Sequence, residues 1–276
     1  MILRVIIELE KNDIIYNLAL EEWIMDHTFE PTLILWKNLP SVVIGKNQNP
    51  WLECKLKLMN KEKIPLARRI SGGGTVYHDN GNLNYSVIVS QSEYRNELAF
   101  DMIINVLKSF DISAERKCKS NLMVDNKKFS GTAFAFRKNK VLHHGTILLN
   151  SDLNKLNRYL GSEYSGIKTK AVKSAPTEVK NLNISNDEFI RKIKAEFKKL
   201  YHPSNNSDFK INNESLSKYL EIRSSDRWIY GTTPNFIISF DNKDLELKRT
   251  NIDSSIMSSK INLFKDKFFN LDKFFS

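Results

Sequence analysis

The order of apolar and polar positions predicts a chain of mixed helices and strands. Helices are expected where apolar residues recur at helical spacing, after a cap at Asn12 or Asp13 and over residues 98–110, 152–161 and 187–201. Strands are expected where short apolar or alternating runs end at turn residues, namely at residues 3–9, 32–37, 41–44, 64–70, 75–78, 83–90, 122–124, 129–137 and 141–149. With 276 residues, this set of elements fits one large α/β or α+β domain.

Two turn signals predict how some strands pair. The Asn-Leu-Pro sequence at residues 38–40 joins two predicted strands and indicates a β-hairpin. The Asp-Asn-Gly sequence at residues 79–81 indicates antiparallel pairing of the strands on either side of it.

Three stretches lack a clear period. Residues 162–177 are rich in Lys, Ser and Gly, and are expected to form a functional loop. Residues 202–215 are polar and read as a linker, and residues 227–240 read as a turn that leads into a strand. The last 36 residues are too few for a core of their own, so we expect a main domain over residues 1–240 and a short accessory remnant over residues 241–276.

Composition narrows the class of protein. A content of 41% hydrophobic and 27% charged residues is typical of a folded soluble protein, and no apolar run reaches membrane-spanning length. The formal charge of +10 suggests an anionic partner without choosing one, and a solvated surface with scattered lysines is the favoured explanation. Cys54 and Cys118 show neither metal-ligand spacing nor a disulfide framework, which fits a reducing compartment. The N-terminus is not typical of a signal peptide or an organelle presequence.

The stretch RRISGGGTVYH at residues 68–78 places three of the ten glycines in a row between two strands. Glycines without a Cβ let the backbone adopt positive φ and approach a ligand closely. Arg68 and Arg69, together with the amides of Gly73, Gly74 and Thr75, would suit phosphate or carboxylate. The alternative is a tight turn beside two surface arginines. The spacing matches neither a P-loop nor a dinucleotide-binding fingerprint.

A second cluster is Lys-Lys-Phe-Ser-Gly-Thr at residues 127–132. Strand alternation sends Lys128 and Ser130 to the same face, where the lysine would be a fixed positive charge. The alternative is an ordinary surface lysine.

The third cluster, His143 and His144, cannot hold one metal ion, because adjacent strand residues point to opposite faces. One of these histidines is expected to be packed or hydrogen-bonded in the core. No Ser-His-Asp set, carboxylate pair or HExxH motif is apparent, which favours chemistry without a protein nucleophile. Acyl transfer from a mixed anhydride with AMP needs only charge stabilisation and positioning, because its leaving group is already good.

The motifs VVIGKNQNPWLECKL, ARRISGGGTVYHDNGNLNYS, KFSGTA, HHGTILLN and VKNL, in this order and at these spacings, resemble the lipoate-protein ligase and lipoyltransferase family. The resemblance runs from about Tyr16 to Phe240 and is closest to the mitochondrial lipoyltransferases. It implies a biotin/lipoate-protein ligase-like α/β catalytic domain with a mixed sheet, followed by a truncated C-terminal accessory segment.

The resemblance also implies the site residues. Lys128 matches the central lysine of the family and is the expected catalytic residue, in contact with the lipoyl carbonyl and the phosphate. The implied lipoyl-AMP-binding residues are Arg69, Ser71, Gly72, Gly73, Gly74, Thr75, Val76, Tyr77, Lys119, Lys128, Thr146, Val172 and Lys173.

By resemblance the activity is a transfer of lipoyl or octanoyl, from lipoyl-AMP or a lipoylated carrier, to a lysine of the lipoyl domains of 2-oxoacid dehydrogenases. Ser120-Asn121 replaces an Asn-Asp pair of the family, and residues 166–179 lack the Arg-Ser-Arg run of ATP-using bacterial ligases. Both differences favour transfer over ATP activation. The alternative is an ATP-dependent lipoate-protein ligase that first makes lipoyl-AMP.

The resemblance further implies no tightly bound cofactor and no metal, with lipoyl-AMP as a substrate and ATP and Mg²⁺ needed only for activation. The implied partners are dehydrogenase E2 subunits and the glycine cleavage H protein, with no nucleic acid or membrane partner. A monomer in mitochondria is expected, and the cytoplasm is the alternative location.

Two readings from other classes remain open at the level of sequence. The charge permits a nucleic-acid-binding module, although no interleaved aromatic and basic motif is visible. A catalytically weak relative retained as a lipoyl-carrier-binding protein is also possible.

Overall fold

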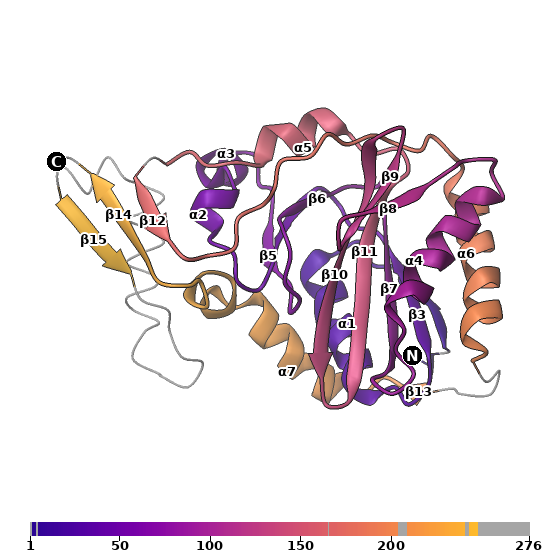
Figure 1. Cartoon of the computed structure of the whole chain (residues 1–276). Coiled ribbons are helices and arrows are strands. Elements are labelled where there is room, and N and C mark those ends of the chain that lie inside the picture. The colour runs from indigo at the N-terminus through magenta and orange to yellow at the C-terminus, as the bar shows by residue number, and fades with distance from the viewer. Residues whose placement is uncertain (1, 4, 165, 204–208, 241–242, 248–276) are drawn as a thin grey trace. The chain divides into compact units, whose positions relative to one another are not determined.

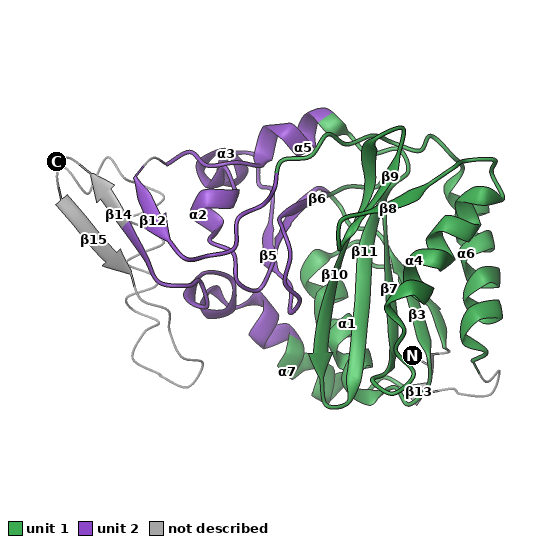
Figure 2. Cartoon of the chain, viewed as in Figure 1, with its two compact units in different colours: residues 1–39, 78–153, 176–219 green, residues 40–77, 154–175, 220–276 purple. Residues whose placement is uncertain are grey.

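The computed structural model describes residues 2–3, 5–164, 166–203, 209–240 and 243–247 (Figure 1). The chain divides into two compact units (Figure 2). Unit 1 comprises residues 1–39, 78–153 and 176–219, and unit 2 comprises residues 40–77, 154–175 and 220–276. The expected domain boundary at residue 240 stays a prediction, and of the expected accessory remnant only residues 243–247 lie among the described residues.

Unit 1 is built on a mixed seven-stranded sheet. Its strand order is β2 (Ile6–Glu8), β3 (Thr32–Trp36), β7 (Asn82–Ser90), β11 (Lys140–Leu148), β10 (Lys127–Arg137), β9 (Asn121–Val124) and β8 (Glu115–Lys117). Only β2 and β3 run parallel, and the other neighbours are antiparallel. A separate short pairing joins β1 (Ile2–Leu3) to β13 (Phe209–Lys210).

Helices cover both faces of this sheet. α4 (Asn96–Lys108) and α6 (Asn186–Tyr201) lie together on one face (Figure 1) and bury Phe100, Phe189 and Phe197 against alternate strand residues such as Val87. α1 (Ile14–His27) packs on the opposite face, and begins at Asp13, whose carboxylate accepts a hydrogen bond from the amide of Tyr16. None of the described helices combines the length and the apolar content that crossing a membrane would need.

Both pairing predictions based on turns are wrong. β3 belongs to the seven-stranded sheet, whereas β4 (Ser41–Ile44) pairs with strands of unit 2. β6 (Val76–His78) and β7 also belong to different sheets, although the amide of Gly81 closes the expected turn on the Asp79 carboxylate at 2.9 Å. A turn motif fixes only a local chain reversal. β7, whose residues are all buried except the partly buried Ser90, pairs instead with β3 on one side and β11 on the other.

Unit 2 holds two small sheets. The first has the order β5 (Leu66–Arg68), β4 and β6, with β4 and β5 parallel. The second has the order β12 (Ile167–Thr169), β14 (Phe236–Phe240) and β15 (Lys243–Leu247). Unit 2 also contains the short helices α2 (Pro50–Glu53) and α3 (Leu56–Lys61) and a π-helical turn, η1 (Arg227–Gly231). α5 (Leu153–Tyr159), α7 (Asn213–Ser224) and β6, whose last residue His78 belongs to unit 1, each contain a boundary between the units.

The stretches expected to be irregular contain some regular structure. Residues 162–177 include β12, which pairs with β14, and residues 202–215 include β13 and the start of α7. The four predicted helices correspond to α1, α4, α5 and α6, and they and the remaining predicted strands lie within a few residues of their predicted bounds, except that the first predicted strand is divided into β1 and β2. Helices α2, α3 and α7 and strand β8 are not predicted from the sequence.

Candidate functional site

The glycine loop, residues 71–74, connects β5 to β6 in unit 2. Gly73 has a φ of 85°, a left-handed conformation that favours glycine. A Cβ added to Gly45, at the end of β4, would lie 2.3 Å from the carbonyl oxygen of Gly73, and the amide of Lys46 donates to the carbonyl of Ser71 at 2.8 Å. The loop therefore closely approaches the protein's own backbone, and Gly45 is a contact that the sequence reasoning missed.

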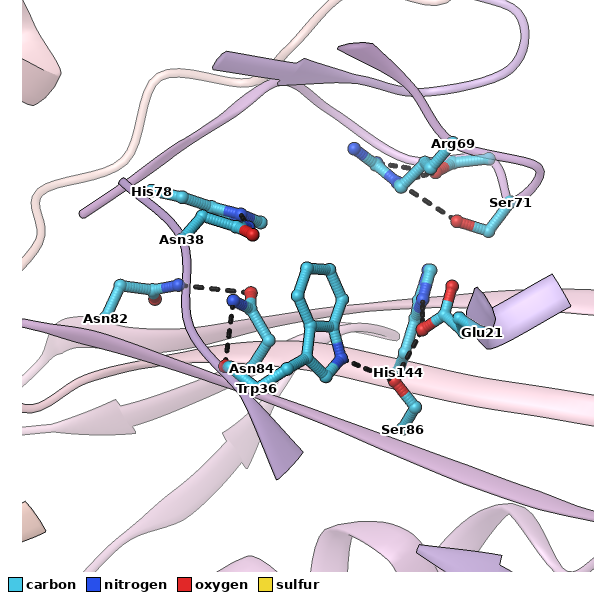
Figure 3. Close-up of polar contacts among 11 residues, drawn as sticks. Glu21, Trp36, Asn38, Arg69, Ser71, His78, Asn82, Asn84, Ser86 and His144 are labelled. Atoms are coloured by element: carbon cyan, nitrogen blue, oxygen red, sulfur yellow. Dashed lines mark hydrogen bonds and ion pairs between the residues drawn. The ribbon is translucent and has the colours of Figure 1, made fainter. Parts of the chain in front are cut away.

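Arg69 is buried inside the glycine loop. Its guanidinium donates a hydrogen bond to the hydroxyl of Ser71 at 3.0 Å (Figure 3). It also donates to the carbonyls of Gly72 and Gly74 at 2.6 and 2.7 Å. The reading of a turn beside surface arginines is therefore wrong. In this structure Arg69 holds the shape of the loop, and its contact with a ligand stays a prediction.

Arg68 is completely buried and organises the rest of unit 2. Its guanidinium donates to four backbone carbonyls, those of Gly45, Lys46, Gln48 and Ile229, and to the hydroxyl of Thr233. The indole of Trp228 in turn donates to the carbonyl of Arg68 at 2.6 Å. Burying a cation is costly unless its donors are satisfied, and these bonds satisfy them.

The loop at residues 162–177 is anchored to the glycine loop by Ser174. The hydroxyl of Ser174 donates to the buried carboxylate of Glu53 and accepts from the amide of Thr75 at 2.9 Å. The side-chain amide of Gln48 donates to the same hydroxyl at 3.0 Å, and the amide of Val172 donates to the carbonyl of Asn47 at 3.0 Å. The Thr75 amide, which the sequence offers to an anion, is thus engaged by a serine hydroxyl.

The lysine cluster lies in unit 1 at an irregularity of β10. Lys128 pairs with Met123 and Ser130 pairs with Leu122, so Phe129 is an extra residue, a β-bulge. Phe129 is fully buried in the core. The backbone of Lys128 also donates to the carbonyl of Glu178 at 2.9 Å and accepts from the amide of Lys180 at 3.0 Å.

The bulge changes the face to which Lys128 points. A Cβ added to Gly131 would lie 2.8 Å from Nζ of Lys128, so this side chain lies on the Gly131 face of the strand. Ser130, the neighbour of Gly131, points to the other face. The prediction that Lys128 and Ser130 share a face is therefore wrong, because alternation fails across the bulge.

Two further predicted residues lie in unit 1. Thr146 on β11 is the direct partner of Gly131, so the structure brings Lys128 and Thr146 together on one face of the sheet. Lys119 is exposed in the turn between β8 and β9, where its carbonyl accepts from Arg116.

The two histidines of β11 do point to opposite faces, as predicted. His143 packs against the rings of Phe100 and Phe134, and burial lowers its pKa to about 3. His144 lies on the α1 face, where its Nδ1 is 2.8 Å from the buried carboxylate of Glu21.

The Glu21 carboxylate belongs to a buried polar network that the sequence reasoning missed (Figure 3). It accepts from the hydroxyl of Ser86, which accepts from the indole of Trp36 at 3.1 Å. A glutamate in the middle of a helix gives no sequence signal of burial. The pattern only becomes visible once α1 is placed on the sheet.

The remaining predicted residues lie in unit 2 and vary in exposure. Tyr77 is buried and packs against Tyr159, with ring centroids 5.7 Å apart and the ring planes tilted by 33°, whereas Val172 and Lys173 are exposed. In the described part of the chain, no group of three or more His, Cys, Asp or Glu side chains could hold a metal ion. The predicted ligand contacts, and the expectation about ATP and Mg²⁺, stay predictions.

Comparisons of the sequence with a family model and with individual proteins all indicate the same family. Residues 13–198 match the lipoyl protein ligase A/B catalytic domain. The chain is 38% identical over 263 residues to the mitochondrial lipoyl amidotransferase of Homo sapiens, covering 86% of this chain and 69% of the relative. It is 36% identical over 239 residues to lipoate-protein ligase A of Psychrobacter cryohalolentis, covering 80% of this chain and 70% of the relative.

A solved structure supports the same conclusion. The crystal structure of P. falciparum LipL1 in complex with lipoate superimposes with a TM-score of 0.70 at 31% identity, covering 89% of this chain and 81% of that chain. The expected lipoate-ligase-like α/β fold with a mixed sheet is therefore confirmed. With the motifs, the sheet and these relatives in agreement, the chain belongs to the lipoate-protein ligase and lipoyltransferase family, through its lipoyl protein ligase A/B catalytic domain.

Proposed function

We propose that this protein is an enzyme that attaches lipoyl groups to lysines of lipoyl domains, and that it acts as a lipoyltransferase. In the proposed reaction the amine of an acceptor lysine attacks the carbonyl carbon of lipoyl-AMP. An amide bond forms, the bond between the carbonyl carbon and the phosphate oxygen breaks, AMP leaves, and the amine loses one proton. No protein nucleophile is required.

The main support for this proposal is the location of the Lys128 side chain in the structure, together with the family to which the chain belongs. Its ammonium lies beside Gly131, the partner of Thr146, on one face of the unit 1 sheet. An ammonium directed at the mixed anhydride would neutralise the phosphate and stabilise the negative charge that develops on the carbonyl oxygen. Such an interaction strengthens in the transition state, so it contributes more to rate than to affinity.

In this proposal the adenylate is bound by predicted residues of unit 2. The Thr75 amide now donates to the hydroxyl of Ser174, and a phosphate oxygen is a stronger acceptor than a hydroxyl. The phosphate would replace that contact, while Tyr77 and the exposed Val172 and Lys173 are the other residues proposed to lie beside the nucleotide.

Transfer is favoured over ATP activation by two local features. Ser120-Asn121 places no carboxylate where Mg²⁺-bound ATP would benefit from one, and residues 166–179 carry no Arg-Ser-Arg run for a triphosphate. The second candidate is an ATP-dependent lipoate-protein ligase, which the 36% identity to lipoate-protein ligase A of Psychrobacter cryohalolentis favours.

The proposed partners follow from the reaction. The acceptors are the lipoyl domains of 2-oxoacid dehydrogenase E2 subunits and the glycine cleavage H protein, and the donor is lipoyl-AMP or a lipoylated carrier. The resemblance to a mitochondrial amidotransferase supports a mitochondrial location, with the cytoplasm as the alternative.

Intact-mass spectrometry of an apo-lipoyl domain tests this proposal in two arms. With lipoyl-AMP we expect the domain to gain one lipoyl group. With lipoate, ATP and Mg²⁺ we expect almost no product and almost no pyrophosphate. Product in both arms would favour the ligase, and no product in either arm would contradict both the ligase and transfer from lipoyl-AMP.

A further inference from the structure

The ammonium of Lys128 and the α-carbon of Gly131 lie unusually close together. An ideal Cβ on Gly131 would be 2.8 Å from Nζ and 2.9 Å from Cε of Lys128, below the separation that real Cβ atoms show. The φ of Gly131 is not positive, so alanine would fit its backbone conformation. The space beside this strand residue is therefore filled by the end of the lysine side chain.

The backbone around Lys128 is held firmly on both sides. The bulge at Phe129 turns Lys128 onto the Gly131 face, and residues 178–180 bond both the amide and the carbonyl of Lys128. The buried ring of Phe129 fixes the bulge from the core side. The Lys128 side chain, whose end lies against Gly131, can still change rotamer more easily than this backbone can move.

We propose that Gly131 is a positioning residue for Lys128. Because Gly131 has no side chain, the Lys128 ammonium can lie directly against β10, and this contact determines the position of the charge. This inference rests on the proposed function for its effect on rate, but its geometric part does not. A methyl group at residue 131 would push Nζ by about 1 Å to reach ordinary contact, and a misplacement of that size can cost ~100-fold in rate.

Gly145 on the neighbouring strand provides a matched contrast. A Cβ there would lie 2.8 Å from the carbonyl oxygen of Gly131 and 2.8–2.9 Å from the ring and hydroxyl of Tyr85. Those atoms are backbone and a completely buried ring, which cannot yield as a lysine terminus does. Gly145→Ala should therefore lower the melting temperature, whereas Gly131→Ala should leave the melting temperature nearly unchanged.

The test is a double-mutant cycle of Gly131→Ala with Lys128→Ala, measured as single-turnover transfer from lipoyl-AMP to an apo-lipoyl domain. We expect Gly131→Ala to lower the rate constant ~10- to 100-fold with less than about a threefold change in affinity for lipoyl-AMP. In the Lys128→Ala background the same change should have an effect of less than about twofold. An equal effect in both backgrounds, wild-type activity of Gly131→Ala, or failure of Gly131→Ala to fold would each overturn the inference.

A crystal structure of Gly131→Ala separates this inference from the proposed function. A displaced Nζ above an unchanged β10 backbone would support it even if the wild-type protein transfers no lipoyl group. An undisplaced Nζ would overturn it whatever the activity.

Discussion

His143 is a buried titratable group that costs stability. Its ring lies among Phe100, Phe134 and Tyr85, and among the described residues neither ring nitrogen has a hydrogen-bond partner. Burial penalises the charged form most, and His144 and Arg116 add a smaller electrostatic effect, which together lower the pKa to about 3. In the unfolded chain the pKa of histidine is about 6.5.

This difference predicts a pH dependence of folding stability. Below pH 6.5 the unfolded state binds a proton that the folded state does not, so stability falls as the pH drops from about 6.5 towards 3, by roughly 2 kcal/mol at pH 5. His143→Leu, which is similar in volume and does not titrate, should flatten this part of the profile in urea unfolding. Parallel profiles for the two proteins would contradict the argument.

Substitution of Arg68 should lower stability strongly, because Arg68, unlike His143, is a buried side chain whose polar groups are hydrogen-bonded. Replacing it with Met leaves the buried carbonyls of Gly45, Gln48 and Ile229 without their donor, so we expect a loss of at least ~3 kcal/mol in chemical unfolding. Arg158→Met is the matched control, because Arg158 is exposed and pairs with Glu62 at the surface. Equal losses for the two variants would show that the buried hydrogen bonds of Arg68 contribute nothing special.

At the scale of elements, the sequence predicts positions better than pairings. The periodicity locates α1, α4, α6 and the long strands, because each must bury an apolar face. It does not predict that β3 and β4 belong to different sheets, since a turn motif describes four residues while pairing depends on partners far along the chain. The bulge at Phe129 is missed for a similar reason, because an inserted residue has no signature of its own.

The anchor at Ser174 predicts local loosening in unit 2. Ser174→Ala removes the acceptor of the Thr75 amide and the donor to Glu53, which we expect to speed hydrogen exchange at residues 170–175 by about tenfold. Ser217→Ala is a suitable control, because that hydroxyl bonds only the carbonyl of Glu214 among the described residues. Unchanged exchange in Ser174→Ala would mean that other contacts hold the loop.

At the scale of the whole molecule, the predicted ligand contacts are divided between the two units. Lys119, Lys128 and Thr146 belong to unit 1, and the glycine loop, Val172 and Lys173 belong to unit 2. Motif order along the chain predicts the family and therefore this set of residues. Chain order does not reveal that Arg69 is enclosed by its own loop or that Gly131 stands under the Lys128 ammonium, because both depend on contacts across turns and bulges.

The most direct test of the central claim is the single-turnover rate of lipoyl transfer from lipoyl-AMP, compared between the wild-type protein and Lys128→Ala. We predict a rate constant at least ~100-fold lower for the variant, with a much smaller change in the dissociation constant of lipoyl-AMP, because the ammonium acts on charge that develops during the reaction. A variant that transfers the lipoyl group as fast as the wild-type protein would contradict this role for Lys128.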